Sequence, residues 1–264
     1  MSVAWSAADR LLRGKWGTSE ELASGRVGMG ASVLLGLGLV GGAVYGAAMG
    51  LFGVLRPAHA TGKQVLADAL KLPLLFLLTL VVAFPSLYAF SALADSKLRF
   101  VQTLKLLLVA IAVNLVLLAS FAPVTAFFTV STTSYSFMVL LNVAFLVLSG
   151  AVGLAVLSKA LRAVYFQPEP SNAALPPEAS SEGERELGSS AEPRRAVARP
   201  RSDPRPRRIF IAWFAIYGLV GSQMGWILRP FIGAPGMEFQ LFRARGGSFF
   251  EGFLTALGQF LTGR

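Results

Sequence analysis

The amino-acid sequence predicts an all-α integral membrane protein, a bundle of about five transmembrane helices with amphipathic interfacial helices at its N- and C-termini. Hydrophobic residues make up 54% of the 264-residue chain and charged residues only 14%, whereas charged residues supply about a quarter of an ordinary soluble domain. The charged residues are also missing from long stretches of the chain. A helix needs about 20 apolar residues to cross a hydrocarbon core of roughly 30 Å, so each of these stretches can hold a span.

Four stretches contain no charged residue and no histidine: 27–55, 72–94, 106–158 and 209–228. The third is long enough for two helices, and Pro123 and the polar residues at 132–136 interrupt it, so we expect a loop there. The sequence therefore predicts spans at about 28–55, 73–94, 101–122, 137–158 and 209–230.

The first stretch is followed by Ala58-His59-Ala60, which is similar to a signal-peptidase site. The stretch 27–55 is about twice as long as the apolar region of a signal peptide, so we interpret it as an uncleaved span. A single crossing and a re-entrant hairpin both fit its length. We expect the connection at 57–71 to lie at the membrane surface.

Residues 1–26 form the first amphipathic segment. Its apolar side chains gather near one helical face, which favours an interfacial helix with tryptophan anchors over a loosely ordered tail. The residues on this face are Trp5, Ala8, Leu11, Leu12 and Trp16.

The chain ends in a turn and a second amphipathic segment, 231–264. Ser248 and Glu251 have the spacing of a capping box, and large apolar residues follow at helical period. The segment 248–263 is short for a span, so we expect an interfacial helix, with a sixth crossing as the alternative. Between the fifth span and this helix, an interface motif is indicated by Trp226, Arg229 and Pro230.

The first span carries a glycine stripe, which consists of Gly38, Gly42, Gly46 and Gly50. Residues four apart lie on one helical face, so the stripe allows another helix to approach closely. The partner can be a helix of the same chain, or a second copy in a homo-oligomer.

Three polar side chains lie inside apolar runs: Asn114, Asn142 and Gln223. Such side chains form hydrogen bonds across helices, worth about 0.6–2 kcal/mol each, or they line a site for a solute. We expect no charged side chain deep in any span, which argues against a proton relay or an ion-coupled transporter.

The segment 167–208 is rich in proline, serine and glutamate and ends in an arginine cluster. Such a composition predicts a disordered linker, which can recruit a protein partner or bind anionic membrane lipids. With this linker in the cytoplasm, 17 Lys and Arg residues lie inside and 7 outside. The positive-inside rule then places the N-terminus in the cytoplasm and the C-terminus outside.

The net charge of +10 reflects this topology, so we expect no nucleic-acid binding. The chain has no cysteine and one histidine, His59, without a partner at motif spacing. We find no phosphate-binding, metal-ligating or nucleophile motif. We therefore expect no catalytic residue, no metal and no cofactor.

Several stretches carry a resemblance to a known family: 69–73 leading to 84–88, 120–124, and 221–226 running on to 228–235. Together they resemble a family of uncharacterised bacterial inner-membrane proteins, some of which are labelled actin-binding WH2-domain proteins. The linker shows no WH2 helix followed by an L-K-K-T-like element. The five-span layout also resembles that of the Yip1 family of membrane-trafficking proteins. The resemblance implies an inner-membrane location and no particular functional residues.

The leading functional hypothesis is a non-enzymatic membrane scaffold or adaptor, because a closely packing first helix, amphipathic ends and a long linker are suited to recruitment. The alternative is a channel or transporter for a neutral or small organic solute.

Overall fold

The computed structural model describes residues 2–15, 28–55, 62–93, 100–165, 204–228, 232, 241–242 and 247–262. Within these ranges every regular element is a helix, as the sequence predicts. The helices are α1 (Ser2–Leu12), α3 (Ala31–Val54), α4 (Lys63–Leu93), α5 (Phe100–Ser131), α6 (Tyr135–Tyr165), α7 (Pro204–Ile227) and α8 (Phe249–Thr262).

Four of these helices, α3 to α6, are long and apolar enough to cross a bilayer, and the chain is a membrane-embedded helical protein. The first charge-free stretch forms one continuous helix, α3, of 24 residues. At a rise of 1.5 Å per residue, α3 is about 36 Å long, enough for a single crossing. The expected fifth span corresponds to α7, whose apolar part, Ile211–Ile227, is shorter than the other four.

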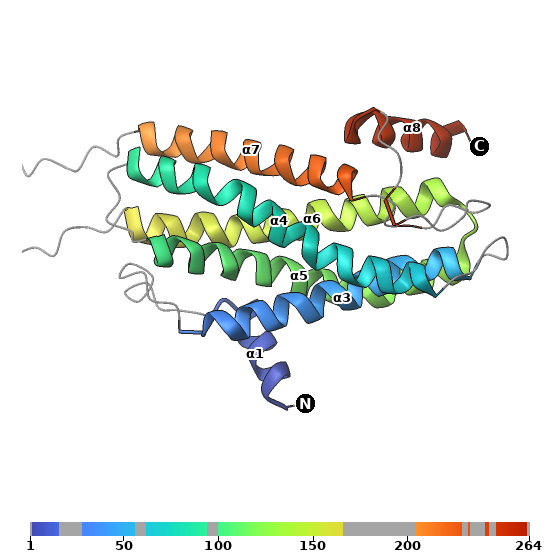
Figure 1. Ribbon diagram of the computed structural model, residues 1–264, viewed down its shortest axis with the longest axis horizontal. Helices are drawn as coiled ribbons and strands as arrows, with labels where there is room; N and C mark the ends of the chain where they lie inside the picture. Colours follow the sequence, from blue (N-terminus) through green and yellow to red (C-terminus); the bar gives the residue numbers. More distant parts are fainter. Residues whose placement is uncertain are drawn as a thin grey trace, which may run out of the picture.

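The helices α3 to α7 lie along a common axis, and successive helices run in opposite directions (Figure 1). Helix α5 is the central helix, because every residue from Leu106 to Val116 is buried. A helix that is apolar all round belongs in the interior of a bundle. The outer flank includes α6, on which Val147 and Leu148 are exposed.

Helix α4 begins about ten residues earlier than the predicted span, so most of the expected surface connection is helical. Pro73 and Pro85 both lie inside α4. The expected break at Pro123 is also wrong, since α5 continues through this residue to Ser131 and only 132–134 separate α5 from α6. Membrane helices tolerate proline where neighbouring groups compensate for the lost backbone hydrogen bond.

The early start of α4 overturns the expectation that the spans contain no buried charge. Asp68 is fully buried and Lys71 is 3% exposed. The Nε2 atom of Gln64 donates to both carboxylate oxygens of Asp68, at 2.9 and 2.7 Å. The ammonium group of Lys71 lies 5.4 Å from the centre of the Phe242 ring, within reach of a cation–π interaction. Both charged groups therefore have partners inside the protein.

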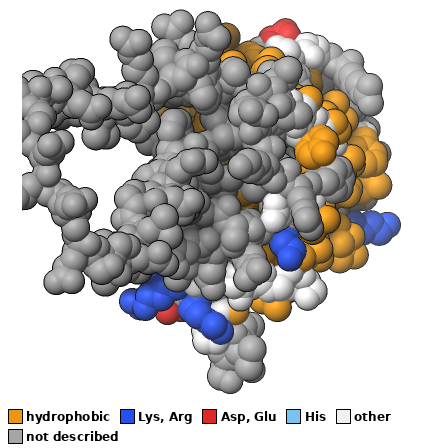
Figure 2. Space-filling view, turned by 90° about the vertical axis from the view of Figure 1, so that its left-hand side faces the viewer, with side chains coloured by type: hydrophobic (Ala, Val, Ile, Leu, Met, Phe, Trp, Pro, Cys, Tyr) orange, Lys and Arg blue, Asp and Glu red, His pale blue; other side chains and the backbone are white. Residues whose placement is uncertain are grey.

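The amphipathic ends dock on this bundle. Helix α1 packs against α3 and α5; its residues Ala7 and Leu11 are buried while Trp5 is exposed. Trp16, expected on the same face, lies outside the described residues. Figure 2 views the end of the bundle where α5 begins and α6 ends, and it shows Lys and Arg side chains at the edge beside a hydrophobic flank.

The linker predicted at 167–208 lies outside the described residues up to 203. The structure places its last residues in α7, which begins at Pro204. Proline is favoured at the first helical position because its missing N–H has no intrahelical partner there.

Candidate functional site

The glycine stripe of α3 packs against other helices of the same chain. A Cβ atom on Gly46 would overlap the carbonyl oxygen of Asp68 in α4, and one on Gly42 would lie 3.1 Å from Cβ of Pro73. The other two glycines of the stripe, Gly38 and Gly50, face α5 and α4 respectively and are likewise buried. The stripe is therefore covered within the chain, and it lets α4 and α5 approach the backbone of α3.

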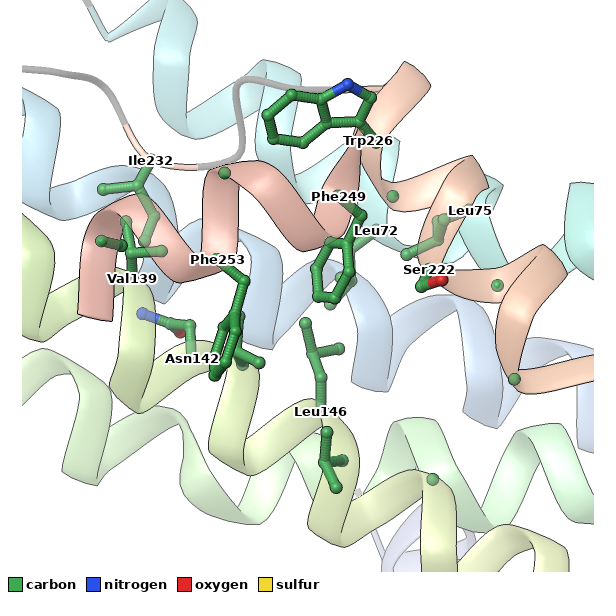
Figure 3. A pocket seen from close by; sticks show the side chains of 18 of the residues that line it. Leu72, Leu75, Val139, Asn142, Leu146, Ser222, Trp226, Ile232, Phe249 and Phe253 are labelled. Atoms are coloured by element: carbon green, nitrogen blue, oxygen red, sulfur yellow. The ribbon is translucent and has the colours of Figure 1, made fainter. Parts of the chain in front are cut away.

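On another side of the bundle, the helices enclose a partly open cavity of about 830 Å³ between α4, α6, α7 and α8. Most of its surface is apolar. Figure 3 shows its wall, which includes Leu72, Leu75, Val139, Leu146, Phe249 and Phe253.

Helix α8 covers this cavity. Its side chains Phe249 and Phe253 point from α8 into the cavity, toward α6 (Figure 3). The sequence predicts the start of this helix correctly, because the hydroxyl of Ser248 accepts a hydrogen bond from the backbone N–H of Glu251. At 14 residues, α8 is about 21 Å long and too short to cross the hydrocarbon core.

Two side-chain hydrogen bonds fasten α8 over the cavity. At its beginning, Nε1 of Trp226 in α7 donates to the carbonyl oxygen of Gly247, at 3.0 Å. Near its end, the hydroxyl of Ser136 in α6 donates to Oε1 of Gln259, at 2.9 Å. One of these hydrogen bonds comes from α7 and the other from α6, so the position of α8 depends on both helices.

Helix α7 presents a second set of glycines to the cavity: Gly218, Gly221 and Gly225. A Cβ atom on Gly218 or Gly225 would meet nothing within 4 Å, and one on Gly221 would meet only a methyl group of Thr79, at 3.8 Å. Unlike the stripe on α3, these glycines face open space. They widen the cavity where a larger side chain would fill it.

Asn142, one of the predicted intramembrane polar residues, lines the cavity and has partners inside the protein. Its Oδ1 accepts a hydrogen bond from the hydroxyl of Tyr45 at 2.7 Å, and its Nδ2 donates to the carbonyl oxygen of Met138 at 2.7 Å. Tyr45 belongs to α3 and Asn142 to α6, so the bond joins two spans. Asn142 therefore acts as a structural cross-link.

Asn114 also lines the cavity but differs from Asn142. Its side chain is 6% exposed, and its Oδ1 is buried without a hydrogen-bond partner. Its Nδ2 lies 4.0 Å from the point where a Cβ on Gly150 would sit, and Gly150 is itself a lining residue. A buried acceptor without a partner costs about 1–3 kcal/mol. Because Oδ1 has almost no exposed surface, a bound molecule can pair with this oxygen only after the terminal torsion of the side chain turns it toward the cavity.

Gln223, the third predicted polar residue, is half-buried on α7 and does not line the cavity; its neighbour Ser222 does. Of the predicted interface motif, Trp226 is the residue that fastens α8, whereas Arg229 and Pro230 lie outside the described residues. The part of the chain that is described contains no group of three or more His, Cys, Asp or Glu side chains that could hold a metal ion.

Sequence reasoning missed the cavity, although two signals pointed to it. The glycines of α7 recur at spacings of three and four, which places them on one helical face. The final helix carries large apolar side chains on two faces, since Phe249 and Phe253 point inward while Phe250 and Leu254 are exposed. A helix that only lay in the interface would need one apolar face.

Comparison of the chain with protein-family models, with curated proteins and with solved structures found no match.

Proposed function

We propose that the chain is a membrane-embedded binding protein for a small, largely apolar organic solute, held in the cavity beneath α8. The observation that supports this best is the combination of an apolar cavity of about 830 Å³ with the unpaired amide of Asn114 on its wall. Cavities of about 300–1,000 Å³ with a few polar groups are typical of small-molecule sites.

The cavity favours solute binding over the scaffold hypothesis for a physical reason. Protein interiors are close-packed, and the side chains around an empty space lose the dispersion contacts that a filled interior provides. The proposal is thus closest to a channel or transporter for a small organic solute, without an enzymatic step.

We further propose that α7 completes a five-span bundle in the bacterial inner membrane, with the N-terminus in the cytoplasm and α8 on the outer side. The alternating directions of α3 to α7 support this arrangement (Figure 1). Lys105 near the start of α5 and Lys159 near the end of α6 lie at the end of the bundle from which the arginine-rich linker departs. That is the end the positive-inside rule assigns to the cytoplasm.

A photolabelling experiment with a matched pair of variants tests the binding function. Gly221→Leu places a side chain into the cavity, whereas Gly36→Leu puts the same side chain at an exposed site on α3 where nothing lies within 4 Å. The full chain in lipid nanodiscs is exposed to a small apolar diazirine, and the labelled peptides are identified by mass spectrometry.

We expect the wild-type chain and Gly36→Leu to be labelled on cavity residues such as Phe253, and Gly221→Leu to lose most of this labelling. Exposed residues outside the cavity such as Leu148 serve as the internal standard, because they contact lipid in all three proteins. Labelling confined to lipid-exposed residues in every protein would contradict the proposal.

A further inference from the structure

We propose that the solute is a neutral lipid alcohol, a molecule with an apolar body and a hydroxyl group that binds to Asn114. This inference rests on the binding function proposed above and adds the chemical class of the ligand. It depends on three features of the cavity: its charge, the state of its polar groups and its surroundings.

The charge of the wall argues against an anionic ligand. Among the lining residues that the structure describes, none is Lys or Arg, and Glu251 is the one acidic residue. A Cβ on Gly247 would overlap the carboxylate of Glu251. The Glu251 side chain therefore lies against Gly247, just before α8 begins. A phosphate or carboxylate head group would thus enter the cavity without a cation to pair with, which is costly in an apolar environment.

Several polar groups of the wall are already paired within the protein, whereas the hydroxyl of Tyr217, which also lines the cavity, has no hydrogen bond to another described residue. The hydroxyls of Thr79, Ser222 and Thr255 donate to backbone carbonyls of their own helices. Gln259 accepts from Ser136, and Asn142 is paired through both of its side-chain polar atoms. Oδ1 of Asn114 is the acceptor on this wall that is buried without a partner.

A hydroxyl group is the smallest group that complements an unpaired carboxamide. The amide offers one acceptor oxygen and one donor nitrogen, and a half-turn of its terminal torsion exchanges their positions. A hydroxyl can both donate and accept, so it matches the amide in either orientation. An alkane would leave Asn114 unpaired, and a carboxylate could only accept.

The surroundings indicate that the ligand comes from the bilayer. On its outer surface α8 exposes Phe250, Leu254 and Leu261 by 51%, 63% and 74%, so α8 has apolar groups toward the lipid as well as toward the cavity. The neighbouring surface of α6 is equally apolar at Val147 and Leu148. An amphiphile in the membrane can thus reach the cavity without crossing a polar surface.

A comparison of three photolabelling probes tests this inference. The full chain in phosphatidylcholine nanodiscs is labelled with a diazirine-bearing hexadecanol, in parallel with the matched palmitic acid and hexadecane probes. We expect the alcohol to label cavity residues best. In Asn114→Leu, the half-saturating concentration of the alcohol probe should rise about tenfold, which is the effect of losing one buried hydrogen bond. The same variant should bind the hydrocarbon probe unchanged, which also shows that it is folded. Gln223→Leu, outside the cavity, is the control.

The outcomes separate this inference from the proposed function. Equal cavity labelling by all three probes, with no effect of Asn114→Leu, would overturn the hydroxyl assignment and leave the apolar binding function standing. A preference for the acid probe would overturn it in the same way. No cavity labelling by any probe would overturn both.

Discussion

The indole nitrogen of Trp226 donates a hydrogen bond to the carbonyl oxygen of Gly247, and so joins the end of α7 to the residue before the cap of α8. Gly247 has a backbone φ of +68°, a left-handed conformation that glycine adopts without strain. The ring of Trp226 also lies against Gly252, where a Cβ atom would overlap it. Trp226 therefore holds the beginning of α8, while the hydrogen bond from Ser136 to Gln259 holds its end.

The first prediction concerns this contact. Gly252→Ala should displace α8 from α7, because its methyl group would occupy the position of the Trp226 ring. Hydrogen–deuterium exchange of the amides in 249–262 should become faster by at least about tenfold. The matched control is Gly258→Ala in the same helix, where nothing lies within 4 Å. That change should slow exchange, since alanine favours helix by about 1 kcal/mol over glycine. Equal exchange in the two variants would contradict the contact.

The second prediction concerns the glycine stripe. Gly46→Ala should destabilise the protein by about 1–3 kcal/mol, because the new methyl group would meet the backbone of α4 at Asp68 and cannot be accommodated by a side-chain rotation. Gly36→Ala, on the same helix but facing open space, should be neutral or stabilising. Thermal unfolding in detergent measures both. A loss of stability in Gly36→Ala as large as in Gly46→Ala would show that packing against α4 is not the cause.

The third prediction concerns the bond between Tyr45 and Asn142. Tyr45→Phe and Asn142→Leu should each destabilise the bundle, by up to about 2 kcal/mol, because each leaves a buried polar group without its partner. The double variant should lose less stability than the two single variants together, since both partners are then removed. A double-mutant cycle based on unfolding in detergent provides this comparison. Strict additivity would mean that the two side chains do not interact.

The fourth prediction concerns the attachment of α7 to α4. Trp213 is fully buried, and its Nε1 donates to the hydroxyl oxygen of Ser86 at 3.0 Å. Trp213→Phe removes this bond and part of the packing, so limited proteolysis of the segment between α6 and α7 should release α7 from the remaining bundle more readily. Trp5→Phe serves as the control because Trp5 is 72% exposed. Equal retention of α7 in both variants would count against this attachment.

Much of this fold follows from local properties of the chain. The positions of α3 to α6 could be predicted from charge-free stretches, because a helix that crosses the bilayer needs a minimum run of apolar residues. The capped, amphipathic α8 could also be predicted from local sequence. The cap and the helical spacing of its apolar residues each involve residues only a few positions apart. The start of α4 could not, because Pro73 lies inside this helix, packed beside Gly42 of α3, and does not mark its beginning.

The candidate site depended on the tertiary structure. Asn114 and Asn142 are indistinguishable in the sequence, each a single amide in an apolar run. They differ because Tyr45, 97 residues from Asn142, reaches the second amide and leaves the first unpaired. The glycines of α3 and α7 show the same contrast, since one set is packed against backbone and the other faces a cavity. Local sequence is enough to predict which segments are helical and apolar. Which of their faces are filled is visible only in the packed bundle, because filling depends on contacts between residues far apart in the chain.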